Sequence, residues 1–252
     1  MFDKQLIRKI NTGRCLILVG SGPSCEIGYP DWKELANHVY KKLDQMGKIK
    51  DHKSYTNFLD KNELPELFRL AESDCGSRNV LINLIKPILK ANERKQGVIY
   101  ELISKWPFAC YLTTNFDDEL NSYLSKHEYF EDIMNRKDDF YIWRDGVNNI
   151  IQKLHSDLLH PDDVILTSRD YDRLYTNASG DYFRVKLRQI FEMFDVLIIG
   201  HSFSDPDIKY ILQKARETSS PQHPIYMVST GYTSAVEQEY LEKGVYPSNE
   251  TI

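Results

Sequence analysis

The chain of 252 residues is 41% hydrophobic and 27% charged, the composition of a globular protein large enough to bury one sizeable core. It has no apolar run of the roughly 20 residues that a membrane span needs, and residues 1–13 do not form a signal peptide, so we expect a cytoplasmic protein. A net charge of −5 argues against direct nucleic-acid binding, and four scattered cysteines without a C-x-x-C pair predict no metal site and no zinc.

The first predicted element is a buried strand, Cys15–Val19, which ends in a glycine-rich turn. The turn carries Gly20, Ser21, Gly22 and Ser24. Such a turn between a strand and a helix lets backbone amides approach a phosphate, and its hydroxyls add donors, so we predict nucleotide binding here. The alternative is a tight turn with only a structural role. The next glycine, Gly28, does not lie at the interval of an ordinary dinucleotide-binding fingerprint.

Helical patterns fill the next part of the chain. The sequence from Asp31 to Glu34 has the form of a capping box, and Leu35, Val39 and Leu43 follow at the spacing of one helix face. Residues 44–104 contain no strong strand, only helix-compatible segments at 64–71 and 80–90. We therefore predict a helical module over about residues 44–104 that covers a ligand cleft.

A second buried strand is predicted at residues 109–113, and polar residues follow it. Thr114, Asn115 and Asp117 lie just beyond its end. Ligands of open α/β sheets bind outside the carboxyl ends of the strands, which makes these side chains candidates for a site. The alternative is an Asn turn followed by an Asp-capped helix.

A weaker strand at residues 150–154 ends in His155. Histidine is the side chain best suited to take or give a proton near neutral pH, so His155 is a candidate catalytic residue. The alternative is a histidine with a structural role. Another weak strand is predicted at residues 164–167.

The last clear motif follows the predicted strand Asp195–Ile199. A predicted helix that includes Phe183 and Leu187 precedes this strand. Gly200 gives the backbone room, Ser202 offers a hydroxyl to phosphate or ribose oxygens, and Asp205 precedes a helix. The alternative is an ordinary serine turn and helix cap. Strands at Ile225–Val228 and residues 244–246 complete the pattern.

The strands are almost continuously apolar, which indicates a parallel sheet covered by helices on both faces, in an α/β fold. We expect a single domain over residues 1–252, with the sheet core at about 1–43 and 105–252. The chain also fits the N-terminal part of a longer protein.

Four motifs in chain order form a set that resembles the sirtuin-like domain of bacterial anti-phage proteins, including the Thoeris-type NAD hydrolases. The motifs are Gly20-x-Gly22-x-Ser24, Thr113-Thr114-Asn115-Phe116-Asp117, Lys153-Leu154-His155 and Ile199-Gly200-x-Ser202-x-Ser204-Asp205. Stretches at residues 28–32 and 163–171 add support, and the resemblance spans about residues 10–250.

This resemblance implies a Rossmann-like core under a helical module, with NAD as the substrate, nicotinamide and ADP-ribose as products, and an anti-phage role through depletion of cellular NAD. By motif matching, Asn115 and His155 take the catalytic positions, and Asp117 resembles the Asp that lies near the nicotinamide amide in sirtuins. The remaining matched positions, on NAD-binding elements, are Gly20, Ser21, Gly22, Ser24, Thr114, Gly200, Ser202 and Asp205. The resemblance also suggests a homo-oligomer or a regulatory partner.

Two departures from the family pattern bear on function. The family commonly has glycine after its histidine, where this chain has Ser156. Deacylating sirtuins carry zinc-binding pairs of cysteines, and this chain has none, which demotes protein deacylation. Three alternatives stay open: a module that senses NAD or ADP-ribose without cleaving it, an NAD-dependent deacylase, and a structural domain of a larger complex.

Overall fold

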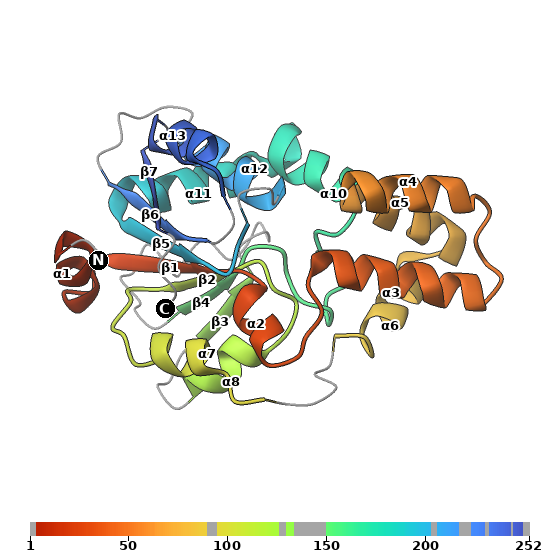
Figure 1. Ribbon diagram of the computed structural model, residues 1–252, viewed down its shortest axis with the longest axis horizontal. Helices are drawn as coiled ribbons and strands as arrows, with labels where there is room; N and C mark the ends of the chain where they lie inside the picture. The colour runs from red at the N-terminus through yellow and green to blue at the C-terminus, as the bar shows by residue number, and fades with distance from the viewer. Residues whose placement is uncertain are drawn as a thin grey trace.

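Seven parallel strands form one sheet in the part of the chain that the computed structural model describes, residues 4–89, 95–125, 130–133, 150–202, 206–216, 223–229, 232–242 and 244–248. The strands are β1 Cys15–Val19, β2 Tyr111–Thr113, β3 Phe130–Ile133, β4 Ile150–Lys153, β5 Asp195–Ile199, β6 Ile225–Val228 and β7 Val245–Ser248. Their order is β3-β4-β2-β1-β5-β6-β7, and every neighbouring pair is parallel (Figure 1). The predicted α/β fold with a Rossmann-like parallel sheet is confirmed.

Helices cover both faces of this sheet because its strands are apolar on both sides. In β1, Leu16 and Leu18 face one core, while Cys15, Ile17 and Val19 face the other, as the two-residue period of a strand requires. The first core is covered by α11 Asp181–Met193, α12 Pro206–Arg216 and α13 Ser234–Glu242. The second is covered by α1 Lys4–Asn11, α7 Val98–Ile103 and α8 Glu119–Leu124 (Figure 1).

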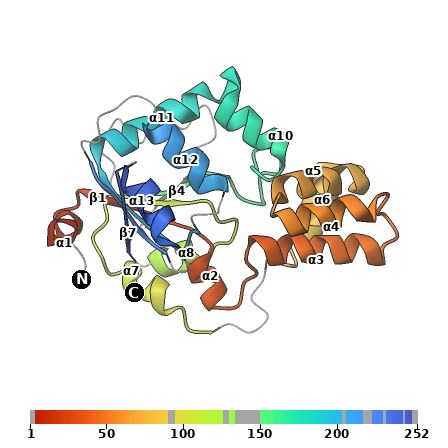
Figure 2. The same ribbon diagram turned by 45° about the horizontal axis from the view of Figure 1, so that its top comes forward.

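Four further helices form a group of their own beside the carboxyl ends of the strands (Figures 1 and 2). They are α3 Trp32–Gln45, α4 His52–Lys61, α5 Leu64–Cys75 and α6 Arg78–Ile85, and they share a separate apolar core. The predicted capping box begins α3, where the Asp31 carboxylate accepts from the Glu34 amide at 2.7 Å. We call α3–α6 the helical module.

The limits of this module differ from the predicted residues 44–104. The apolar face of α3 packs on α5, so α3 belongs to the module and not to the sheet core. Tyr100 and Ile103 of α7 pack instead on the sheet. Periodicity predicts the helix of α3, but it does not tell which of two cores an apolar face meets.

The strand predicted at residues 164–167 is absent, and this prediction is wrong. The segment is extended, yet Val164 and Leu166 enter the core of the helical module while Ile165 enters the core of the sheet. Its backbone amides bond to the carbonyl of His155 and to the side chain of Asp170, not to a neighbouring strand. The side chains of this segment therefore alternate between two cores, and the segment is a connection and not a strand. It leads into α10 Ser168–Tyr171 and a π-helical turn, Asp172–Thr176.

None of the helices in the described ranges is long and apolar enough to cross a membrane. The remaining short elements are α2 Gly22–Glu26 and a 3-10 turn, Ala178–Gly180.

Candidate active site

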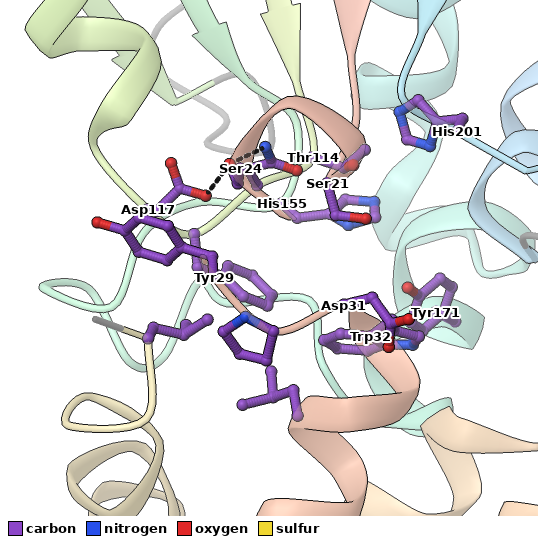
Figure 3. Close-up of a pocket in the computed structure, with 15 residues that line it drawn as sticks. Ser21, Ser24, Tyr29, Asp31, Trp32, Thr114, Asp117, His155, Tyr171 and His201 are labelled. Atoms are coloured by element: carbon purple, nitrogen blue, oxygen red, sulfur yellow. Dashed lines mark hydrogen bonds between the residues drawn. The ribbon is translucent and has the colours of Figure 1, made fainter. Parts of the chain in front are cut away.

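A cleft lies where the carboxyl ends of β1, β2, β4 and β5 meet the helical module, with about 590 Å³ of space not filled by protein atoms, open solvent included. The side chains that line it are Ser21, Ser24, Tyr29, Pro30, Asp31, Trp32, Leu35, Leu89, Thr114, Asn115, Phe116, Asp117, His155, Tyr171 and His201 (Figure 3). The turns after the strands supply most of the polar residues, and Trp32 and Leu35 of α3 supply an apolar wall.

Asn115 follows β2, and its backbone amide donates to the Thr113 hydroxyl at 3.0 Å. Its side-chain nitrogen Nδ2 donates to the carbonyl of Gly20 at 2.9 Å and lies 3.3 Å from the Ser24 hydroxyl. A backbone carbonyl can only accept, so the side-chain atom that faces Gly20 is the nitrogen. The protein thus uses the amide nitrogen of Asn115, which leaves the side-chain carbonyl oxygen to accept from a ligand.

Asp117 stands beside Asn115, and its carboxylate accepts from two donors. Ser24 donates to it through the hydroxyl at 2.8 Å, and the backbone amide of Glu119 donates at 3.0 Å. Burial raises the pKa of Asp117, although these hydrogen bonds act in the opposite direction. The Ser24 hydroxyl is also 2.7 Å from the hydroxyl of the fully buried Tyr100. Tyr100 therefore connects α7 to the cleft.

Lys153 fixes the loop that carries these residues. It is the last residue of β4, its side chain is buried, and its ammonium donates to the carbonyl of Asp117 at 2.7 Å and to the Asp118 carboxylate at 3.2 Å. Because β2 and β4 are neighbouring strands, this bond joins the loop after one strand to the end of the other. Nothing in the sequence pattern around Lys153 indicated this role.

His155 lies two residues beyond Lys153 and is buried, with 1% of its surface exposed. Its ring nitrogen Nε2 is 3.0 Å from the Tyr175 hydroxyl, and its ring meets Tyr171 edge-on. Ser156, which follows, has a φ of 65°, in the left-handed region that favours glycine. This backbone conformation explains why glycine fits the same position in the family pattern.

The glycines predicted to bind nucleotide serve here to bring two turns together. The amides of Gly20 and Gly22 donate to the carbonyls of Ile199 and Gly200, at 2.9 and 3.0 Å. A Cβ on Gly20 would lie 2.6 Å from the His201 ring, and one on Gly22 would lie 2.7 Å from the Gly200 Cα. Gly20, Gly22 and Gly200 do not line the cleft, and their part in NAD binding stays a prediction.

Of the other predicted site residues, the cleft brings together Ser21, Ser24, Thr114, Asn115, Asp117 and His155. Ser202 is exposed and does not line it, and Asp205 lies outside the described residues. Sequence reasoning singled out neither His201 nor Tyr100. The stretches with Trp32 and Tyr171 supported the resemblance, but nothing in them indicated a wall of the cleft. In the described ranges, no group of three or more His, Cys, Asp or Glu side chains could hold a metal ion.

The fold and the site together define a class of protein. The chain runs from β1 to β2 on one side and from β5 to β6 on the other, so the neighbours β1 and β5 mark the point where the connections change direction. Ligands of open α/β sheets bind at such a point, and the cleft includes Ser21 and His201 from the turns after these two strands. The molecule is a Rossmann-like α/β protein with a ligand cleft under a helical module.

Within this class, the chain belongs to the SIR2-like domain family, whose model matches residues 109–246, more than half of the sequence. It is 26% identical over 237 residues to the NAD(+) hydrolase ThsA of Acinetobacter baumannii (strain 532279), covering 88% of this chain and 44% of that protein. It is 24% identical over 222 residues to the NAD(+) hydrolase ThsA of Bacillus cereus (strain MSX-D12), covering 86% and 43%.

This chain therefore spans less than half the length of these relatives. A solved structure described as "Structural Basis for the Mechanism and Regulation of Sir2 Enzymes" has a similar fold, with a TM-score of 0.50 and 10% identity, covering 98% of this chain and 92% of that one. The family predicted from the ordered motifs is confirmed.

Proposed function

We propose that this chain is an enzyme that hydrolyses the nicotinamide–ribose bond of NAD to give nicotinamide and ADP-ribose. One observation carries the proposal: Asn115 and His155, which follow the neighbouring strands β2 and β4, line the same cleft in a member of the SIR2-like family. The relatives named NAD(+) hydrolase add support.

The chemistry asks for positioning more than for acid catalysis. Nicotinamide leaves as a neutral molecule while positive charge develops on the ribose, so the site must orient the sugar, exclude bulk water and supply a placed nucleophile. With its amide nitrogen bound to Gly20, Asn115 accepts from a ribose hydroxyl or from the attacking water through its side-chain oxygen. His155 accepts the proton that this water or hydroxyl releases.

Asp117 has a place in the same scheme. Its two hydrogen bonds keep the carboxyl fixed beside Asn115. We assign Asp117 to bind the nicotinamide carboxamide, whose NH₂ group can donate a hydrogen bond to the carboxylate. The aromatic rings of Trp32 and Phe116, with centroids 6.0 Å apart, supply an apolar wall that excludes water from the ring of the leaving group.

The test is to incubate the purified chain with NAD and to resolve the products by chromatography. Asn115→Ala and His155→Ala are each expected to lower nicotinamide release at least about 100-fold, the range that a placed proton acceptor contributes. His38→Ala is the matched control, because His38 is exposed on α3 and does not line the cleft. Thermal melting checks the fold, since Asn115 also bonds to the protein.

Three outcomes would count against the proposal. If both variants still release nicotinamide at the wild-type rate, the catalytic roles assigned to Asn115 and His155 are wrong. Binding of NAD without release of nicotinamide favours a sensing module, and release that requires an acyl-lysine peptide favours a deacylase. Products would be compared with and without such a peptide in the same assay.

The proposed biological role is that of an anti-phage effector that depletes cellular NAD. Unrestrained hydrolysis of NAD would harm the cell that makes the enzyme, so this role calls for restraint by self-assembly or by a partner domain. The relatives named ThsA are more than twice as long as the segment that this chain matches, which leaves room for such a domain.

A further inference from the structure

His155 is oriented by a side chain that does not line the cleft. Tyr175 is fully buried, and its hydroxyl lies 3.0 Å from Nε2 of the His155 ring. The two rings meet edge-on, with centroids 6.3 Å apart. One of the two ring nitrogens of His155 is therefore engaged on the side of the protein.

Tyr175 is itself held firmly by aromatic neighbours. It stacks on Tyr210 of α12 at 5.0 Å with an interplanar angle of 16°, and it meets Phe183 of α11 edge-on at 5.6 Å. It belongs to the π-helical turn Asp172–Thr176, which directly follows the α10 residue Tyr171. Such turns insert one extra residue per turn and redirect side chains, often at functional sites. The hydroxyl that faces His155 is thus part of a rigid aromatic stack.

We infer that Tyr175 is a positioning residue that acts through His155, because its hydroxyl fixes the His155 ring through Nε2. The inference rests on the proposed function. The bond at Nε2 also selects one form of the neutral ring, since Nε2 carries a hydrogen if it donates to the Tyr175 oxygen and carries none if it accepts from the hydroxyl.

The bond to Tyr175 bears on the rate because it fixes both the position and the form of the His155 ring. A ring without the tyrosine hydroxyl can adopt either form and can also rotate. A misplacement of about 1 Å in such a group costs on the order of 100-fold in rate.

The first test is Tyr175→Phe, which removes the hydroxyl and keeps the ring in the stack. We expect kcat for NAD hydrolysis to fall by about 10- to 100-fold, with KM for NAD changed less than about threefold, because the bond orients a proton acceptor and not the substrate. Tyr210→Phe is the matched control: it makes the same change in the same stack, on a residue whose described ring contacts are with Tyr171 and Tyr175. It is expected to keep the wild-type kcat.

The second readout is the ¹⁵N NMR spectrum of the histidine rings in the protein without NAD, with the His155 signal assigned by its loss in His155→Gln. The wild-type chain and Tyr210→Phe are expected to hold His155 in the same single form of the neutral ring, and Tyr175→Phe is expected to show a mixture of both forms. An unchanged His155 signal in Tyr175→Phe, or an unchanged kcat, overturns the inference while hydrolysis by the wild-type chain stands. If the wild-type chain releases no nicotinamide, the proposed function is overturned, and the positioning role of Tyr175 in that reaction is overturned with it.

Discussion

Ser156, next to the candidate catalytic histidine, carries two local energetic costs. Its φ of 65° costs a non-glycine residue roughly 1–2 kcal/mol. Its hydroxyl oxygen is buried and has no hydrogen-bond partner among the described residues, which costs a further 1–3 kcal/mol or so. The backbone there serves the placement of His155, whose carbonyl accepts from the amide of Ile165 at 3.1 Å.

Replacing Ser156 with glycine is therefore expected to stabilise the protein. Glycine removes both costs and adds an entropic penalty of about 0.5–1 kcal/mol in the unfolded chain, so the net gain is about 1 kcal/mol or more. For a chain of this size that raises Tm by at least about 2–4 °C. Ser156→Ala is the matched control, because it removes the buried hydroxyl and keeps the strained φ. Melting curves should rank glycine above alanine and alanine above serine; a glycine variant no more stable than the wild type would contradict the argument.

At the scale of residues, sequence reasoning found the side chains that follow strands. Asn115 and His155 were predicted because parallel strands place the residues beyond their ends at one edge of the sheet. Their partners Tyr100 and Tyr175 come from helical segments far away in the chain, where a tyrosine in an apolar pattern is indistinguishable from a core residue. The acceptor role of the Asn115 oxygen likewise depends on a bond to Gly20 that only the fold creates.

At the scale of elements, the turn after β1 and the end of β5 cross so closely that side chains are excluded. Gly200 has a φ of 70°, and a Cβ there would lie 2.4 Å from Cδ of Pro23. The crossing holds the turn that presents Ser21 and Ser24 to the cleft. The turns after β1 and β5 can therefore pack directly against each other only because glycine has no side chain.

Gly200→Ala is expected to cost about 3 kcal/mol or more, because a contact of this length forces one of the two turns to move and the left-handed backbone adds its own cost. Gly47 provides the control: its φ is 64°, and a Cβ added there meets no atom within 4 Å. Gly47→Ala isolates the cost of the backbone conformation, about 1 kcal/mol. Denaturant unfolding of the two variants measures the difference. Equal losses of stability would show that the backbone conformation, and not the crossing, requires glycine at position 200.

The elements that sequence reasoning missed have identifiable causes. The edge strand β3 reads Phe-Glu-Asp-Ile, and two acidic residues in four conceal it from a search for apolar runs. The segment at 164–167 has the right alternation for a strand, but the two faces that its side chains meet belong to different cores. At 164–167 the local pattern predicts an extended backbone, but it cannot tell whether a neighbouring strand is present.

At the scale of the whole molecule, the helical module is joined to the segment that follows His155. Arg78 of α6 donates to the carbonyl of Pro161 at 2.6 Å and to the carboxylate of Asp170 at 3.0 Å, and it also bonds to the carbonyl of Val164. Its remaining nitrogen bonds to Glu72 of α5 at 2.9 Å. A single guanidinium therefore connects two helices of the module to the chain between β4 and α10. That chain leads to Tyr171 and Tyr175, so the module and the orientation of His155 share one support.

Arg78→Met is expected to destabilise the protein by about 3 kcal/mol, because it removes one partner of a largely buried ion pair and leaves two carbonyls without their donor. Tm should fall by about 6 °C or more. Arg69→Met is the matched control: Arg69 pairs with Glu66 within one exposed helix turn, where side chains are 37% and 40% exposed, and such a pair contributes less than about 1 kcal/mol. Equal effects of the two substitutions in denaturant unfolding would show that the module is held by its apolar contacts with Leu158 and Leu166 instead of by this guanidinium.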